Sequence, residues 1–229
     1  MNVVSICPLP VASLVWQHRP STWTLTVVCK ATFLLRPGES TLAPEQEAPN
    51  EYDNYWNDDD ERSLLAASDL APLKPRVDVV LVGQAYAPGR QPVRSLAARL
   101  KVGEVDKTVE VFCDRSLSID GSIQEGAPFA RMPLVYERAA GGPRTSNPVG
   151  MRRDARDVYG RVPLPNLQPP GLGPIASVDM IGPIGFGPIA PRWPARRTRL
   201  GHHASSWPAL PMMPKSWKPR KSVAMSEPY

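Results

Sequence analysis

Prolines are spread along almost the whole chain and occupy 28 of its 229 positions. Because proline fixes φ and lacks a backbone N–H group, it is excluded from the interior of α-helices and from central strands. An average protein contains only about 5% proline. This density excludes a fold built on long helices, and it favours short strands that are joined by turns and irregular loops.

The most distinctive segment, residues 68–88, reads SDLAPLKPRVDVVLVGQAYAP. Pro72 and Pro75 keep its first half extended. The apolar run at residues 79–82 is short, rich in β-branched side chains and followed by Gly83, which predicts a buried strand. The charged residues along this extended approach, whose opposite charges can pair, are Asp69, Lys74, Arg76 and Asp78.

Two hairpins are predicted. Residues 22–35 are rich in β-branched and aromatic side chains, which predicts a strand; a Pro-Gly turn ends it, and residues 39–42 follow as a short partner strand. Residues 93–102 and 105–113 alternate between apolar and polar side chains on either side of a Gly-Glu pair, which predicts a β-hairpin with one solvated face. This alternation places Cys113 on the apolar side, as a buried structural cysteine.

Helix candidates are few and short, at residues 61–70 and 134–140. Residues 45–61 carry eight acidic side chains and no basic one, which indicates a solvated surface loop. The acidic run at residues 58–61 lacks the alternating ligands and the central glycine of a calcium loop. We therefore predict a mostly β fold of antiparallel, sandwich-like sheets with few short helices.

Between residues 141 and 193, glycine and proline interrupt nearly every apolar group. The segment nevertheless keeps large apolar side chains such as Leu164, Phe186 and Trp193, which a flexible linker does not need. We interpret residues 141–193 as an ordered, irregular coat of a single β-rich domain that spans residues 1–193. Residues 194–229 are basic and rich in proline and tryptophan, and we expect them to form a disordered tail.

Cysteine usage and the N-terminus indicate the compartment. Cys7, Cys29 and Cys113 are far apart in sequence, which argues against a disulfide framework or a zinc site and favours a reducing compartment. No basic residue precedes the apolar N-terminal run, which Pro8 and Pro10 interrupt. No stretch is long and apolar enough to span a membrane, so we expect a cytoplasmic protein with no membrane partner.

Motifs of enzymes and cofactor sites are weak. The triplet Cys113-Asp114-Arg115 is the only tempting nucleophile, and no GxSxG motif occurs. The sequence GPIGFG at residues 182–187 does not fit a phosphate-binding loop, and His202 and His203 are too close together to share a metal. We therefore expect no catalytic residue, no cofactor and no metal. The net charge of +5 and the basic tail suggest an anionic partner, but we favour a tail that binds no nucleic acid.

Seven segments occur in the same order in one known family. They are KATF at residue 30, the segment at residues 68–88, VGEVDKTVEVFCDR at 102, FARMPLVYERAAGG at 129, NPVG at 147, LPNL at 164 and GFGPIAPRW at 185. By these motifs the chain resembles the domain-of-unknown-function 2169 family (DUF2169). The resemblance covers about residues 2–193; beyond Trp193 the sequence departs from the family pattern, as a truncated or frame-shifted gene would.

The resemblance implies a function. Members of this family accompany bacterial type VI secretion clusters and are similar to adaptors or chaperones that mount a toxic effector on the secretion spike. This implies a non-enzymatic protein whose partners are a secreted effector and a spike or spike-tip protein. The alternative is an enzyme, perhaps a hydrolase, with a site in the loops of the Gly/Pro-rich half. The charges that either bind a partner or pin loops to the sheet are Asp69, Lys74, Asp78, Arg131, Tyr136, Glu137 and Arg138.

Overall fold

The computed structural model describes residues 3–72, 74, 77–152, 154–173 and 182–199. Within these residues it confirms a mostly β fold, with several small antiparallel sheets, one α-helix and single 3-10 turns. The elements are β1 (Val11–Arg19), β2 (Thr22–Cys29), β3 (Phe33–Leu34), β4 (Thr41–Leu42), β5 (Asn54–Tyr55), η1 (Trp56–Asp58), β6 (Leu64–Ala66), β7 (Gln84–Tyr86), η2 (Pro88–Arg90), β8 (Ser95–Val102), β9 (Val105–Phe112), β10 (Arg115–Leu117), β11 (Ile123–Glu125), β12 (Arg131–Pro133), η3 (Tyr136–Arg138), β13 (Val162–Leu164), β14 (Leu167–Gln168) and α1 (Pro194–Arg199).

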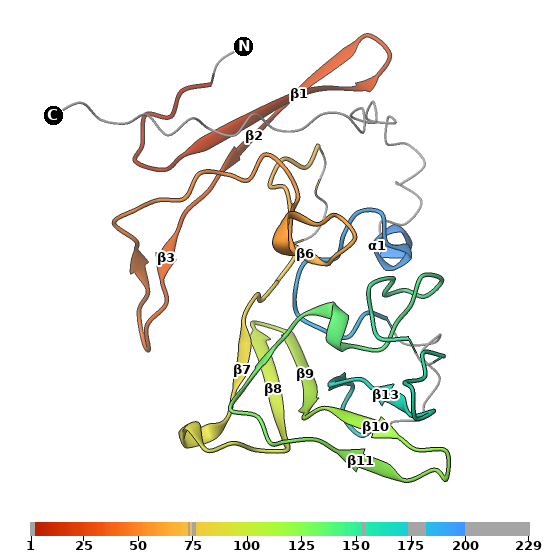
Figure 1. Cartoon of the computed structure of the whole chain (residues 1–229). Helices are drawn as coiled ribbons and strands as arrows, with labels where there is room; N and C mark the ends of the chain where they lie inside the picture. Colours follow the sequence, from red (N-terminus) through yellow and green to blue (C-terminus); the bar gives the residue numbers. More distant parts are fainter. Residues whose placement is uncertain (1–2, 73, 75–76, 153, 174–181, 200–229) are drawn as a thin grey trace, which may run out of the picture.

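Strands β1 and β2 form a two-stranded ribbon at one end of the molecule (Figure 1). Their antiparallel register places Val11 opposite Cys29. One face of the ribbon is tied to the chain that follows β6. The indole N–H of Trp16 donates to the Thr26 hydroxyl oxygen at 2.9 Å, and that hydroxyl donates to the Pro72 carbonyl at 3.1 Å.

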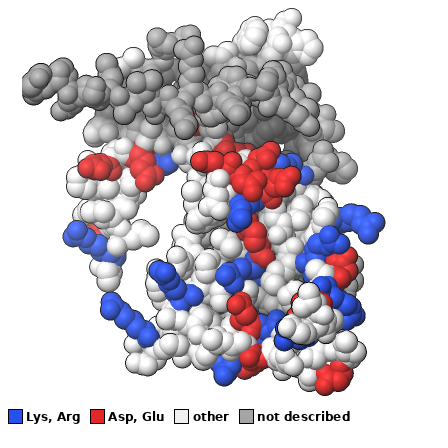
Figure 2. Space-filling view, in the orientation of Figure 1, with Lys and Arg blue, Asp and Glu red and all other residues white. Residues whose placement is uncertain are grey.

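The strand predicted over residues 22–35 is shorter than expected. β2 ends at Cys29, and the chain pairs again only in β3, which forms a hairpin with β4 and places Phe33 opposite Leu42. The turn and the returning partner strand are confirmed. The β3–β4 hairpin stands apart from the body of the molecule (Figures 1 and 2).

The long hairpin is confirmed and forms the centre of the body. β8 and β9 pair from Ser95–Phe112 to Val102–Val105, and β14 extends the sheet along β9. Gly103 turns the chain between them with a φ of +57°, a conformation that glycine adopts without strain. The buried side chains of the main core are Ala85, Val109, Val111, Cys113, Phe129, Met132, Leu134, Ala139, Leu167 and Phe186.

Smaller sheets surround this hairpin. β7 pairs with β12, β10 lies between β11 and β13, and β5 pairs with β6. Acidic and basic side chains are interspersed over the lower part of the body (Figure 2). The lower part of the body therefore presents mixed charges on this face, whereas acidic side chains gather near its upper end (Figure 2).

The buried strand predicted at residues 79–82 is wrong. This run belongs to no strand, and Val80, Leu81 and Val82 are 52%, 37% and 40% exposed. The Leu81 N–H donates to the Phe186 carbonyl at 2.8 Å, and the strand proper begins two residues later in β7. The run is apolar enough for a core strand, but the described residues do not cover both of its faces.

The helix predictions need correction as well. Residues 61–70 contain strand β6 rather than a helix. Residues 134–140 contain only the 3-10 turn η3. Ser63 in the first segment donates to Glu137, and Tyr136 in the second accepts from Asn147. These tertiary hydrogen bonds override the local helix propensity.

The Gly/Pro-rich segment at residues 141–193 adds strand β13 next to β10 and strand β14 next to β9, and it is otherwise irregular where it is described. Trp193 is 1% exposed and forms a second core with Leu64, Tyr136 and Ala190. Helix α1 follows directly after Trp193. The remaining basic tail, including His202 and His203, lies outside the described residues. No helix in the described ranges is long and apolar enough to cross a membrane.

Candidate functional site

The turn η3 consists of three consecutive residues, and the side chain of each one contacts a different distant segment of the chain. Tyr136 is 3% exposed, and its hydroxyl donates to the Gly187 carbonyl at 2.7 Å. Its ring meets Trp193 edge to face, with the centroids 5.3 Å apart. A Cβ atom at Gly185 would lie 2.8 Å from this ring, so glycine is required for the loop to pass so close. Tyr136 thus holds the GFGPIAPRW motif against the body.

Glu137 connects the same turn to the segment that precedes β6. Its Oε1 accepts from the Ser63 backbone N–H at 2.9 Å, and its Oε2 accepts from the Ser63 hydroxyl at 2.7 Å. Ser63 is 1% exposed. Both oxygens of this carboxylate are therefore used inside the fold.

Arg138 connects the turn to the end of β9. Its guanidinium donates to the Asn166 side-chain oxygen at 3.1 Å and contacts the Asp114 carboxylate at 3.5 Å. The Asn166 amide donates to Asp114 at 2.9 Å and to the Phe112 carbonyl at 3.1 Å. The Arg138 carbonyl in turn accepts from the Asn166 backbone N–H at 2.9 Å. We call Tyr136, Glu137 and Arg138, with these partners, the η3 junction.

Asn147 completes the η3 junction and was not among the predicted site residues. Its side-chain amide donates to the Tyr136 carbonyl at 2.8 Å and to the Ala140 carbonyl at 3.1 Å. A Cβ atom at Gly150 would lie 2.4 Å from this amide nitrogen. The NPVG motif therefore combines a buried amide with the glycine that makes room for it. The only sign of this role in the sequence was that Asn147 belongs to the NPVG motif. The same holds for Asn166, which belongs to the LPNL motif.

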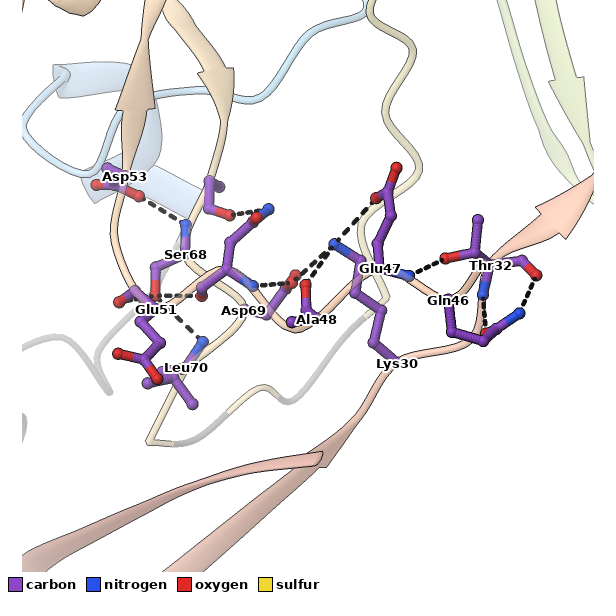
Figure 3. A network of polar contacts seen from close by, with 12 residues as sticks. Lys30, Thr32, Gln46, Glu47, Ala48, Glu51, Asp53, Ser68, Asp69 and Leu70 are labelled. Carbon is purple, nitrogen blue, oxygen red and sulfur yellow. Dashed lines mark hydrogen bonds and ion pairs between the residues drawn. The ribbon is translucent and has the colours of Figure 1, made fainter. Parts of the chain in front are cut away.

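Asp69 belongs to a separate network, at the base of the ribbon (Figure 3). Its Oδ2 accepts from the Asn50 backbone N–H at 2.8 Å and lies 3.5 Å from the Lys30 ammonium. Lys30 also lies 3.5 Å from Glu47 and donates to the Ala48 carbonyl. Asp69 therefore holds the end of β2 next to the chain that leads into β5.

Asp78 forms a third group. Its Oδ2 lies 3.5 Å from the Lys74 ammonium and 3.3 Å from the Arg196 guanidinium on α1. The sequence indicated that opposite charges in this segment can pair, and Lys74 and Asp78 do so; both groups are about half exposed, and such ion pairs contribute little stability. Arg76 lies outside the described residues.

Arg131 is the one predicted site residue that joins none of these groups. It lies in β12 opposite Tyr86, and its side chain is exposed. No hydrogen bond or ion pair connects its side chain to the residues that the structure describes. From the predicted set, the structure brings together Tyr136, Glu137 and Arg138 in the η3 junction and, separately, Lys74 with Asp78.

Two ionisable side chains at the edges of these groups have shifted pKa values. Burial raises the pKa of Tyr55, and Asp53 raises it further, while Arg192 above its ring lowers it. Burial lowers the pKa of Arg115, whose guanidinium stacks 3.6 Å from the Phe112 ring centroid. Arg115 is adjacent in space to Cys113, which is fully buried, as predicted.

Most polar groups of the η3 junction are satisfied by backbone and side chains of the same chain, but the buried side-chain oxygen of Asn147 has no hydrogen-bond partner among the described residues. Across the described ranges, no three His, Cys, Asp or Glu side chains gather as metal ligands. The arrangement is suited to holding loops in place: one short turn fixes the positions of four motifs that are distant in sequence.

Comparison with known proteins agrees with the motif order. The sequence matches a family model described as an uncharacterized protein conserved in bacteria (DUF2169) over residues 21–224. The match continues past Trp193, where we expected the resemblance to end; the proposed truncation stays a prediction. No curated protein and no solved structure matches the chain. Because the family model covers well over half of its residues, the chain belongs to the DUF2169 family of proteins conserved in bacteria.

Proposed function

We propose that this protein is a non-enzymatic adaptor or chaperone that binds a type VI secretion effector and assists its loading on the secretion spike. The family membership makes such a role a coherent hypothesis. The structural observation that carries it is an apolar face on the β1–β2 ribbon that remains exposed to solvent.

We call this surface the ribbon face; it consists of Val15, Trp23, Leu25 and Val27. These side chains are 47%, 70%, 38% and 49% exposed. The register places Val15 opposite Leu25, and alternate residues of a strand point to the same side, so the four side chains lie on one face. Contiguous apolar surface of this kind is uncommon on a monomer and marks sites of protein interaction.

The β3–β4 hairpin adds further apolar surface beside the ribbon. Phe33 and Leu42 form a cross-strand pair, and both are about half exposed. Leu35 is 90% exposed. Within the described ranges, no other strand pairs with β1 or β2, so both edges of the ribbon offer backbone groups to an added strand. A partner that binds here buries apolar side chains and can extend the ribbon.

The charged residues predicted as site residues and the ribbon face have different roles in this proposal. Glu137 and Arg138 are engaged within the η3 junction, and Asp69 is engaged at the base of the ribbon. These residues stabilise the fold that presents the ribbon face. We therefore assign partner binding to the ribbon face and a scaffold role to these charges.

The test is a pull-down after co-expression with the product of the neighbouring gene, where that gene encodes a secreted toxin or a spike-tip protein. The Trp23→Ser/Val27→Ser variant changes the ribbon face. The matched control, Val158→Ser/Tyr159→Ser, changes side chains that are 92% and 72% exposed on the body. We expect the control to retain the partner and the ribbon variant to lose it. Absence of a complex at every salt concentration contradicts the adaptor role, and equal binding by both variants contradicts the ribbon face.

A further inference from the structure

Two exposed cysteines lie near each other at the end of the ribbon, although they are 22 positions apart in the sequence. Cys29 is the last residue of β2 and lies opposite Val11, the first residue of β1. One residue further on, the Lys30 N–H donates to the Pro10 carbonyl at 3.1 Å. The chain before Pro10 bends at residues 6–9, and the Cys7 side chain lies near enough to that of Cys29 for the two to interact.

The surroundings of the Cys7 sulfur show where the bend places it. The Ser5 hydroxyl lies 3.2 Å from Sγ. The Leu9 backbone and the Cys29 side chain also lie close enough to this sulfur to lower its pKa. The two thiols therefore lie near each other at this end of the ribbon, and both are exposed and free.

The same surroundings favour the thiolate form of Cys7. The pKa of Cys7 is lowered, mainly by the hydrogen bond from the Ser5 side chain and then by that from the Leu9 backbone. The thiolate is the nucleophile in thiol chemistry, and exposed thiols of lowered pKa next to a second cysteine are typical of redox-sensitive sites. Cys113, by contrast, is fully buried in the main core.

We propose that Cys7 and Cys29 form a reversible redox site, in which a small-molecule disulfide such as oxidised glutathione converts the two thiols into an intramolecular disulfide. This is one labile bond on an exposed bend, different from a structural disulfide framework. Cytosolic disulfides are mostly of this transient kind.

The chemistry follows thiol–disulfide exchange. The Cys7 thiolate attacks one sulfur of the oxidant, which breaks its S–S bond and releases one thiolate. The Cys29 thiolate then attacks the Cys7 sulfur of the mixed disulfide and releases the second thiolate. The protein loses two electrons and two protons in total, and the small-molecule disulfide is reduced to two thiols.

The bond would close the chain between residues 7 and 29 at the open end of the ribbon. Cys29 lies on the same face of β2 as Val27 and Leu25, because alternate residues share a face. The oxidised form therefore fixes the bend at residues 6–9 beside the ribbon face. The inference does not depend on the adaptor role, since it concerns the thiols alone.

The experiment uses the purified full-length chain in glutathione buffers of increasing oxidised fraction, followed by alkylation and trypsin digestion. Trypsin does not cut between Arg19 and Pro20, so Cys7 and Cys29 remain on one peptide, and Cys113 lies on another. We expect the first peptide to lose the mass of two hydrogen atoms and to resist alkylation. The Cys113 peptide should be alkylated normally after denaturation. Reduction should restore both alkylation sites.

Matched variants test the geometry. In Val27→Cys/Cys29→Ser, the second thiol moves along the same face of β2 by two residues, or about 7 Å. Because Val27 is about half exposed, this thiol remains accessible but lies beyond the reach of Cys7. We expect at least a tenfold smaller intramolecular disulfide fraction than in the wild type at the same glutathione ratio. Separate glutathione adducts on both wild-type cysteines, a disulfide between two chains, or equal closure in the variant would each overturn the proposal.

Discussion

Glu137 accepts two hydrogen bonds from Ser63, although the two residues are 74 positions apart in the chain. One comes from the Ser63 backbone and one from its hydroxyl, so the pair fixes both the position and the orientation of the segment before β6. This contact connects the region that carries the ribbon to the body of the molecule. Both carboxylate oxygens of Glu137 accept hydrogen bonds within the fold, so Glu137 is a structural residue of the η3 junction.

Replacing Glu137 by glutamine should destabilise the protein. Glutamine has one side-chain oxygen and one amide nitrogen, and the nitrogen cannot accept a hydrogen bond. One of the two Ser63 donors, the backbone N–H or the hydroxyl, therefore loses its acceptor in a buried place. Such a loss costs about 1–3 kcal/mol of unfolding free energy. Chemical denaturation of Glu137→Gln, Ser63→Ala and the double variant measures it. Because the two residues are in direct contact, the double variant should lose less than the sum of the single losses, and strict additivity would contradict the pairing.

Gly185 should not tolerate a methyl group. A Cβ atom would lie 2.8 Å from the Tyr136 ring, which its hydroxyl contact to Gly187 and its packing on Trp193 hold in place. Gly185→Ala should therefore lower the unfolding free energy by about 1–3 kcal/mol, as overpacking does. Gly83→Ala is the control, because a Cβ there meets nothing within 4 Å. Equal thermal midpoints of the two variants would show that the Tyr136 ring can move aside.

Thr26 should anchor the ribbon to the rest of the protein. It accepts from Trp16 and donates to the Pro72 carbonyl, and valine has nearly the same shape but neither function. Thr26→Val should raise amide hydrogen exchange in β1 and β2 well before it affects β8 and β9, since the ribbon has few other tertiary contacts. Thr24→Val changes the same face of β2 and serves as the control. Uniform exchange in both variants would mean that other contacts anchor the ribbon.

Lowering the pH should protonate the Asp106 carboxylate and so weaken its ion pair with Arg99. The hydrogen bond from Arg99 is the main cause that lowers the pKa of Asp106, and the Arg99 Nε lies 2.8 Å from the carboxylate. Since the folded pKa is below the ordinary value of about 3.9, the stabilisation is present above that value and is lost as the pH falls through the folded pKa.

An NMR titration of the Asp106 carboxyl group should show its pKa returning to the ordinary range in Arg99→Gln. Lys101 lies directly opposite Asp106 in the strand register and also carries one positive charge. Lys101→Gln is therefore a charge-matched control that keeps the Arg99 hydrogen bonds. An equal pKa rise in both variants would assign the effect to net charge rather than to the hydrogen bonds.

Local patterns predicted the elements whose partners are close in sequence. The alternation around Gly103 indicates the β8–β9 hairpin, because each strand carries its own apolar side and the turn joins them directly. The same alternation correctly predicts the burial of Cys113. The Pro-Gly turn likewise predicts the pairing of β3 with β4.

Secondary-structure predictions failed where the conformation or burial of a segment depends on parts of the chain that are distant in sequence. The run at residues 79–82 has the composition of a core strand, yet Val80, Leu81 and Val82 are exposed, and within the described residues the run is bound through the Leu81 N–H to the Phe186 carbonyl rather than paired in a sheet. Residues 61–70 have a helical pattern, but the pairing of β5 with β6 and the contact of Ser63 with Glu137 hold them extended. Hydrophobicity and propensity describe a segment alone, whereas these outcomes depend on which surfaces meet it.

The sequence by itself determined the class of fold and the family, because proline density, turn chemistry and motif order are properties of neighbouring residues. Tertiary structure alone decided that Tyr136, Glu137 and Arg138 form one junction while Asp69, Asp78 and Arg131 lie elsewhere. It also decided that Cys7 lies near Cys29 and that the apolar side chains of the ribbon face are exposed. The physical reason is that packing joins residues whose separation along the chain carries no signal of their contact.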